Sequence, residues 1–169
     1  MAGAALLSAE DRFAIEDLLF RFMRAFDDKD WETMRACLAD TIDCDYSSFR
    51  GTPPSKIARD EYVTLRVSAL AALRTQHNLT NIAISRSGSN VEVRCNYAIL
   101  RYHRDFDGSP DTYFHSRGQY RFSMTGSTAG WRIASITQTL LTNEGNPALH
   151  RGAQKIIPAE GANTRVQSR

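Results

Sequence analysis

The sequence has few cysteines and little excess of charge of either sign, and both scarcities exclude classes of protein. Its three cysteines are an odd number with no CxxC pair, so neither a disulfide framework nor a zinc knuckle is expected. The formal net charge is only +2, from 21 basic and 19 acidic residues, with no long run of lysine and arginine. So weak a bias provides no general field for gripping a phosphate backbone, and nucleic acid is not an expected partner.

Long apolar segments are missing as well. No stretch approaches the roughly 18 apolar residues of a membrane span, so no membrane contact is expected. The opening residues 1–7 lack the basic and long apolar regions of a signal peptide. We therefore predict a cytoplasmic protein with reduced thiols. The common phosphate-loop, zinc-protease and serine-hydrolase motifs are absent too.

The chain nevertheless has enough apolar residues to build one core. It has 169 residues, of which 42% are hydrophobic and 24% charged, as is ordinary for a single globular domain. From Gly145 onward the composition turns polar and small. We expect one domain over residues 1–145 and a polar tail over 146–169 that is either disordered or a lid.

Three helices are predicted in the first half of the chain. Ser8 and Asp11 form a capping signal for a helix that ends at residues 27–28. Its apolar positions recur at helical spacing, at Ile15, Leu18, Leu19, Phe20, Phe22, Met23 and Phe26. Asp30 can cap a second, short helix. A third helix is predicted over about residues 58–74, with apolar members at Tyr62, Leu65, Val67, Leu70 and Leu73.

The second half of the chain is predicted to be a sheet, because after His77 the apolar period changes to two. Strands are expected around 82–84 and over 91–103, 112–124 and 131–141, with hairpin turns at 87–90 and 125–130. An earlier stretch, 41–49, also leans toward β structure. Helices followed by an antiparallel meander indicate an α+β domain.

Asp27 and His77 are the first candidates for chemistry. Asp27 lies at the edge of the apolar stripe of the first helix, where burial would raise its pKa unless a cation or donor pairs with it. Alternatively, Asp27 simply ends the helix and lies in water, since aspartate is common at helix boundaries. His77 lies at the predicted junction of helix and sheet, and histidine suits acid and base work near neutrality. A structural hydrogen bond is the alternative role.

The other histidines and two tyrosines are weaker candidates. His103 falls on the inward face of its strand together with Arg101, whereas His115 is predicted to lie outside the core. Tyr46 and Tyr97 could point their phenols into a cavity, although strand aromatics are usually core residues. Two histidines and a carboxylate can bind a metal, and His77, His103 and Asp27 would be such a set. Their spacing does not favour it, and no metal is predicted.

Three segments of the helical half resemble scytalone dehydratase in order and separation: Phe26–Trp31, Asp45–Phe49 and Leu73–His77. The wider pattern, including Gly130–Ile133, resembles the SnoaL-like group of the nuclear transport factor 2-like superfamily. Residues 77–97 are just as similar to the small subunits of aromatic-ring-hydroxylating dioxygenases. The resemblance implies a cone-shaped fold, in which a curved antiparallel sheet wraps around a pocket closed by the N-terminal helices.

The resemblance also implies roles for individual residues. In the dehydratase, a pocket histidine and an aspartate-supported second histidine manage protons, and tyrosines bind a water that polarises the substrate carbonyl. His77 matches the first histidine, Asp27 the aspartate and Tyr46 one tyrosine. The other tyrosine falls on Phe26, so that phenol is lost here.

The second histidine of the dehydratase falls near Arg101, and His103 lies two residues further on the same strand face. Which of the two fills this cationic position is left open. The polar pair expected on the next strand falls near Gly118 and Tyr120. The substrate contacts therefore differ from those of the dehydratase.

Eliminating water from a hydroxyl β to a carbonyl needs a base, an acid and a donor to the developing enolate, and one histidine can serve as both base and acid. We predict a cofactor-independent lyase (a dehydratase) or isomerase that acts on a hydroxylated cyclic ketone or polyketide-like aromatic. The predicted catalytic residues are His77, Asp27, Tyr46 and His103; the predicted substrate-binding residues are Phe26, Tyr97, Arg101 and Tyr120. From the group, a homodimer or homotrimer is expected.

Two other functions fit the same resemblance. The chain could be a non-catalytic small subunit that scaffolds an aromatic-ring dioxygenase, in which case no buried Asp27–His77 pair is needed. It could also be a small-molecule binding protein with the same pocket and no turnover.

Overall fold

A computed structural model of the chain describes residues 7–87, 90–128 and 130–150. Its centre is a curved six-stranded sheet with the strand order β2-β1-β6-β5-β4-β3. The strands are β1 (Leu38–Asp45), β2 (Ser55–Ala58), β3 (Leu73–Ser87), β4 (Asn90–His103), β5 (Phe114–Ser127) and β6 (Gly130–Gly145). All neighbouring strands are antiparallel except β1 and β6, which are parallel. The α+β class and the curved sheet are confirmed, with this one parallel pair added.

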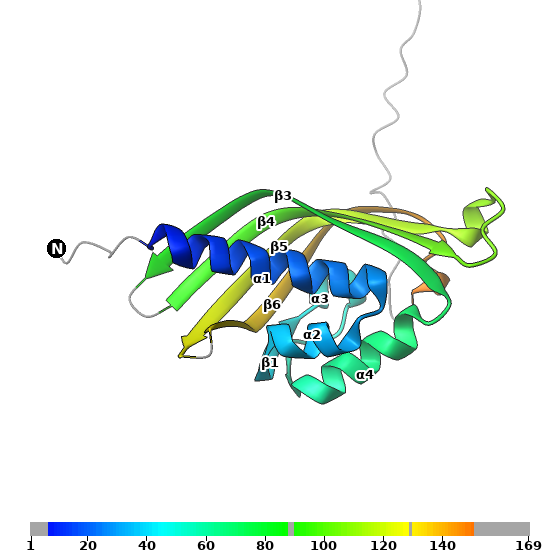
Figure 1. Ribbon diagram of the computed structural model, residues 1–169. Coiled ribbons are helices and arrows are strands. Elements are labelled where there is room, and N and C mark those ends of the chain that lie inside the picture. Colours follow the sequence, from blue (N-terminus) through cyan, green and yellow to red (C-terminus); the bar gives the residue numbers. More distant parts are fainter. Residues whose placement is uncertain (1–6, 88–89, 129, 151–169) are drawn as a thin grey trace, which may run out of the picture.

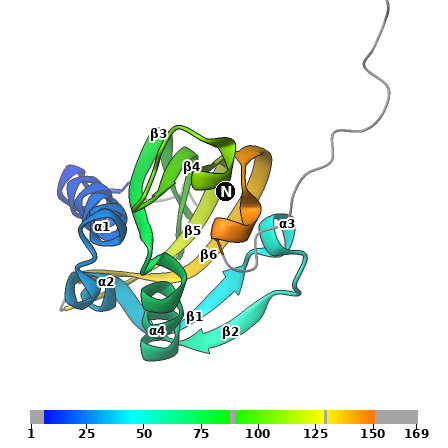
Figure 2. The same ribbon diagram turned by 90° about the vertical axis from the view of Figure 1, so that its right-hand side faces the viewer.

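The main helices lie together along one face of the sheet (Figures 1 and 2). They are α1 (Ala9–Asp28), α2 (Trp31–Cys37) and α4 (Arg59–Leu70), and a single turn, α3 (Ser47–Arg50), follows β1. Two 3₁₀ turns, η1 (Pro110–Thr112) and η2 (Pro147–Leu149), connect and end the sheet. None of the helices in the described ranges is long and apolar enough to cross a membrane.

Helix α1 forms as its capping signal predicts. The Ser8 side chain accepts a hydrogen bond from the Asp11 backbone N–H at 3.0 Å, and Lys29 ends the helix in a left-handed conformation. The predicted apolar stripe is buried against the sheet, with one exception. Phe20 is 52% exposed and lines an open hollow beside residues 76–79 of β3, so its assignment to the buried stripe was wrong.

Helix α4 is shorter than predicted, and its buried face is different. The buried positions are Tyr62, Val63, Arg66 and Leu70, which follow the spacing of one helix face. Leu65 and Val67, two of the apolar members expected in this helix, are exposed. The chain leaves the helix at Leu70 and enters β3 at Leu73. His77 therefore lies inside a strand rather than at a junction.

The long strands agree closely with the predicted periods. In β4 the inward set runs from Val91 to Arg101, alternating with partly exposed residues. The two predicted hairpins join β3 to β4 and β5 to β6, where Ser87 pairs with Asn90 and Ser127 with Gly130. The turn residues 88–89 and 129 lie outside the described ranges.

His115 needs a correction. It was predicted to lie outside the core, yet its side chain is buried, with ring contacts to Tyr102 at 4.9 Å and Tyr113 at 4.8 Å. Its neighbours Phe114 and Ser116 point to the opposite face, where Ser116 contacts Arg101. His115 thus fills a small aromatic cluster on the other side of the sheet from the helices.

Candidate active site

The end of α1 is tied to β3 by a carboxylate and an imidazole. The Nδ1 of His77 lies 2.6 Å from Oδ1 of Asp27, and the His77 backbone N–H donates to Oδ2 at 2.9 Å. The Thr75 hydroxyl donates to Oδ1 at 3.0 Å. Lys29 Nζ also donates to the Thr75 hydroxyl oxygen at 3.2 Å and to the carbonyl oxygen of Phe26 at 3.0 Å. Of the two roles left open for Asp27, the structure shows the paired one.

The pair is arranged as a neutral imidazole held by a carboxylate. Burial alone would raise the pKa of Asp27, but the hydrogen bonds and charge of His77, with Thr75, outweigh it, and the pKa is lowered. The pKa of His77 is lowered by burial, and Asp27 offsets only part of that effect. Near neutral pH the Nδ1–H therefore donates to Asp27, and Nε2 carries a free lone pair.

His77 faces an internal cavity of about 30 Å³ between the helices and the sheet. A water molecule needs roughly 10–15 Å³ of such a volume, so the cavity has room for about two waters. Its walls are aromatic rings, guanidinium groups and His77 itself; the lining residues are Phe26, Tyr46, Arg50, Tyr62, Arg66, Leu70, His77, Ile99, Arg101, Tyr120, Gln138 and His150. Because the cavity is this small, an aromatic ligand can enter only if some of this lining moves.

Most of the predicted site residues meet here. Phe26, Tyr46, His77, Arg101 and Tyr120 line the cavity. The Phe26 ring stacks on the His77 ring with centroids 4.7 Å apart, so the residue that replaces a phenol supports the imidazole by packing. Asp27 is not among the lining residues; it contacts Nδ1 of His77, as expected of a group that holds the imidazole ring in place.

Tyr46 shares a hydrogen bond with Tyr62, whose hydroxyl oxygen is 3.0 Å away. Burial, followed by the neighbouring Tyr62, raises the pKa of Tyr46 well above its ordinary value, and the charge of Arg66 only partly offsets this. The guanidinium carbon of Arg66 lies 5.0 Å from the Tyr46 ring centroid and 4.3 Å from that of Tyr62. The Tyr46 phenol therefore keeps its proton and can donate to an oxygen in the cavity.

Of Arg101 and His103, only Arg101 lines the cavity. Arg101 is 3% exposed, and its Nη1 donates to the Ser116 hydroxyl oxygen at 3.0 Å. His103 lies at the end of β4, outside the cavity, where its Nδ1 accepts from the Asp105 backbone N–H at 3.2 Å. The inward face of β4 ends before His103, so the structure does not bring this residue to the site. The candidate metal set with His77 and Asp27 is likewise not assembled.

Tyr97 and Gly118 form the layer behind the cavity wall. The Tyr97 ring packs against Tyr120 at 4.6 Å between centroids, and only Tyr120 lines the cavity. A Cβ atom at Gly118 would collide with the Thr139 carbonyl oxygen and lie 3.0 Å from the Tyr97 ring. The polar residue that the resemblance suggested at this position therefore has no room.

Several residues that line the cavity were not among the site residues predicted from the sequence. Arg66 and Gln138 had a usable signal, since Arg66 lies between Tyr62 and Leu70 on one helix face and Gln138 alternates with Ile136. Arg50 lies on the single turn α3, too short to show a period. His150 was assigned to the polar tail, yet it is buried. Residues 146–150 thus pack on the domain, and the rest of the tail lies outside the described ranges.

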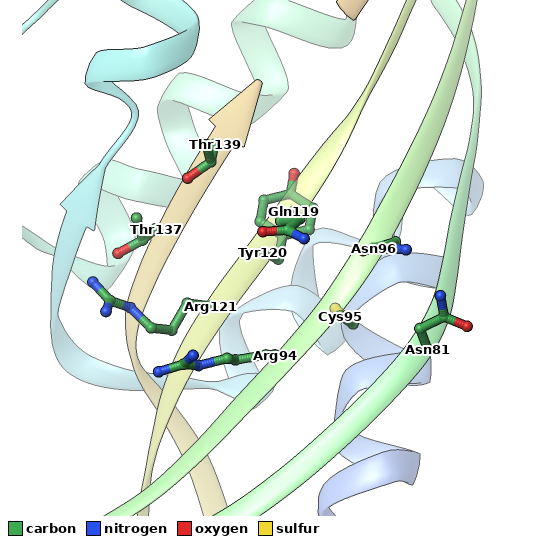
Figure 3. Close-up of a pocket in the computed structure, with 9 residues that line it drawn as sticks. All are labelled: Asn81, Arg94, Cys95, Asn96, Gln119, Tyr120, Arg121, Thr137 and Thr139. Carbon is green, nitrogen blue, oxygen red and sulfur yellow. The ribbon is translucent and has the colours of Figure 1, made fainter. Parts of the chain in front are cut away.

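A larger hollow of about 430 Å³ lies on the face of the sheet away from the helices (Figure 3). Arg94 and Arg121, which are paired across β4 and β5, extend side by side along it (Figure 3). Asparagine, glutamine and threonine make up most of the remaining lining. None of its nine lining residues is a histidine or carboxylate, so this hollow offers no acid–base pair.

Comparisons with known proteins agree with this fold. The model of the SnoaL-like domain family matches residues 7–137. A 72-residue segment is 32% identical to the scytalone dehydratase-like protein claB of Passalora fulva; it covers 40% of this chain and 44% of that protein, so the match spans less than half of the relative.

Two solved structures illustrate the likeness in shape. A candidate scytalone dehydratase of Novosphingobium aromaticivorans superposes with a TM-score of 0.70 at 18% identity, covering 89% of this chain and 96% of that one. The beta subunit of the benzoate 1,2-dioxygenase of Burkholderia mallei has a TM-score of 0.59 at 22% identity, covering 80% and 91%. Both likenesses concern the fold, and the family match over residues 7–137 shows that this chain belongs to the SnoaL-like domain family.

Proposed function

We propose that the protein is a cofactor-independent lyase, a dehydratase, or the corresponding isomerase, acting on a hydroxylated cyclic ketone or polyketide-like aromatic. The observation that carries this proposal is the buried pair of Asp27 and His77, joined at 2.6 Å, with His77 lining a cavity. A neutral imidazole whose Nδ1–H is held by a carboxylate is prepared to act as a base through Nε2. A scaffold or a carrier has no need of this arrangement.

In the proposed reaction, Nε2 of His77 removes the proton on the carbon next to the substrate carbonyl. The Tyr46 hydroxyl, supported by Tyr62, donates a hydrogen bond to the enolate oxygen that develops. The imidazolium then returns its proton to the β-hydroxyl, the C–O bond breaks, a C=C bond forms and water leaves. An isomerase would return the proton to another carbon instead. Asp27 stabilises the imidazolium and fixes its orientation throughout.

The relative named scytalone dehydratase-like supports the dehydratase class, because a 72-residue segment of this chain is 32% identical to it. The substrate contacts differ: the phenol expected at residue 26 is a phenylalanine, and Arg101 stands in the place of a histidine. The proposed substrate is therefore related in reaction but not in shape. The cavity residues Phe26, Arg101 and Tyr120 are proposed to contact it directly, with Tyr97 supporting Tyr120.

The direct test is turnover by purified variants. A panel of β-hydroxy cyclic ketones is incubated with the protein, and loss of water is followed by mass spectrometry and by the absorbance of the new conjugated bond. His77→Ala is expected to lower the rate by about 10²–10⁴. The matched control is His103→Ala, which removes the same kind of side chain outside the cavity and should keep the wild-type rate. Equal rates in the two variants would remove His77 from the mechanism.

The likeness to a dioxygenase beta subunit supports one other candidate function, a scaffold subunit. A native mass spectrum of the protein purified gently from its source separates the two. We expect a homodimer or homotrimer in the cytoplasm that retains a small organic ligand. A stoichiometric complex with a much larger chain would instead favour the scaffold and withdraw the catalytic roles.

A further inference from the structure

Three arginines from separate elements line the cavity: Arg50 of α3, Arg66 of α4 and Arg101 of β4. Arg66 is 6% exposed and Arg101 3%, while Arg50 is half-buried. Arginine is rarely buried in a protein unless a carboxylate or another anion accompanies it. Three of them around one small cavity therefore need an explanation.

The described residues provide no such anion. None of these three guanidinium groups forms an ion pair with a carboxylate of the described ranges. Arg50 and Arg66 pack on the Tyr46 ring, each with its guanidinium carbon 5.0 Å from the centroid. Arg101 packs over Phe49 and donates one hydrogen bond to the Ser116 hydroxyl. In the described structure, the buried Nε atoms of Arg50 and Arg101 have no hydrogen-bond partner.

The other ionisable groups of the cavity show the same positive field. Burial, and then the charges of Arg101, Arg50 and Arg66, hold the pKa of His150 well below its ordinary value. Burial lowers the pKa of Arg101 to about 10; Tyr120 and Tyr97 act against this lowering, and repulsion from Arg50 and Arg66 adds to it. Asp27 is already occupied by His77 and Thr75 and faces Lys29. The cavity therefore carries an excess of positive charge that a ligand can neutralise.

We infer that the cavity binds an aromatic carboxylate, with Arg50, Arg66 and Arg101 around the carboxylate group and the rings of Phe26, Tyr46 and Tyr120 around the aromatic part. A planar guanidinium with one edge free offers two parallel N–H groups, which match the two oxygens of a carboxylate. Arg101 has such an edge, because Ser116 occupies only its Nη1. The aromatic walls suit a flat ring better than a small inorganic anion.

This inference deepens the proposed function, on which its catalytic meaning rests. The substrate would then be a hydroxylated cyclic ketone that also carries a carboxylate. Fixing that group on the arginines would direct the reacting carbon toward Nε2 of His77. Because the cavity has room for only about two waters, binding must displace part of the lining, and His150 at the end of the described chain is one candidate.

The test compares benzoate with benzamide, its neutral analogue of nearly the same shape, by calorimetry on the full-length protein. Benzoate should bind at least about tenfold more tightly than benzamide. Arg101→Gln should lose that preference because benzoate binding weakens more than benzamide binding, and Arg101→Lys should restore part of it. Arg94→Gln is the matched control, since it removes an arginine from the opposite face of the sheet, and it should bind as wild type does. Circular dichroism verifies that each variant is folded.

Three results would overturn the inference: no benzoate binding at millimolar concentrations, equal affinity for benzoate and benzamide, or unchanged benzoate affinity in Arg101→Gln. Inorganic phosphate is included as a competitor, and displacement of benzoate by an equal concentration would assign the cavity to small anions instead. Repeating the titration with His77→Ala separates this inference from the proposed function. If benzoate still binds to His77→Ala, the anion site is supported even where turnover is lost. If the protein turns over a neutral ketone and benzoate does not inhibit that reaction, the proposed function is kept and the anion site is refuted.

Discussion

Replacing Asp27 by asparagine tests the central pair without changing its size. In the wild type, Oδ1 of Asp27 accepts from Nδ1 of His77 and Oδ2 accepts from the His77 backbone N–H. Asparagine has one oxygen and one NH₂ group, so only one of these positions can still accept. If the NH₂ group takes the place of Oδ2, it faces the His77 backbone N–H, and the hydrogen bond between them is lost because both groups are donors. If it takes the place of Oδ1, it donates to Nδ1 and moves the imidazole proton to Nε2, where a base is needed.

The size of the reduction in turnover rate depends on which of these two orientations of the asparagine dominates. A hydrogen bond to a charged group contributes about 1.5–3 kcal/mol, which corresponds to roughly 10–150-fold in rate if it is fully expressed in the transition state. Moving the proton to Nε2 removes the base altogether, a loss of about 10²–10⁴-fold. We therefore expect Asp27→Asn to slow turnover by at least about tenfold, and by up to about 10⁴-fold where the wrong tautomer prevails.

The pH dependence gives a second, independent readout of the same change. Burial, Arg101 and Lys29 lower the pKa of His77, and Asp27 is the group that raises it. Without the carboxylate only the lowering influences remain, so the pKa of His77 moves further down in Asp27→Asn. NMR titration of the ring nitrogens should show this displacement. The acid limb of kcat/KM, which lies below the ordinary value of 6.5 in the wild type, should move to lower pH with it.

The control is Asp28→Asn, which neutralises the adjacent, exposed carboxylate of the same helix end. It should leave both the rate and the His77 titration at wild-type values. An Asp27→Asn variant with wild-type turnover would refute the role of the pair in catalysis. A His77 titration that is the same in both variants would mean that the two side chains do not interact in solution.

Four further changes probe the wall and the packing. Tyr46→Phe should lower kcat by about 10–10³-fold with little change in thermal midpoint, because one donor to the enolate is lost; an unchanged kcat would exclude this phenol. Gly118→Ala should reduce the free energy of unfolding by about 1–3 kcal/mol, measured by urea denaturation, since the new methyl group meets the Thr139 carbonyl. Phe22→Ala should reduce the free energy of unfolding by about 3–5 kcal/mol, because Phe22 is buried on the inner face of α1. The pKa values of His77 and His150 are lowered in the folded state, so below about pH 6.5 the unfolded chain binds more protons than the folded one, and stability should fall as the pH drops further. His150→Phe should weaken this dependence of the thermal midpoint on pH. An unchanged dependence would contradict the burial of His150.

The sequence predicted the structure best where one local pattern determines both the type of secondary structure and which residues face the core. Alternation along residues 91–103 predicted which side of β4 faces the helices, and it was right for Arg101 but wrong for His103, where the buried pattern has already ended. The capping signal at Ser8 and the spacing of α1 likewise placed Asp27 at the helix edge, next to the core. Parallel pairing of β1 with β6 was not predictable in this way, because it joins residues nearly a hundred positions apart and has no local pattern.

The charged lining of the cavity was hidden from the sequence for a different reason. Sequence patterns point to apolar residues, so Leu65 and Val67 of α4 were named as members of the helix, whereas Arg66 between them was not. The helix obeys its period nonetheless: Tyr62, Arg66 and Leu70 share one face, and the guanidinium is buried on two tyrosine rings. Burying an arginine without a carboxylate opposes folding, and a sequence optimised for stability alone would avoid it. Such a residue persists where a ligand supplies the missing charge, so the exceptions to the apolar pattern, Arg66 and Arg101, are the positions at which the site is to be sought.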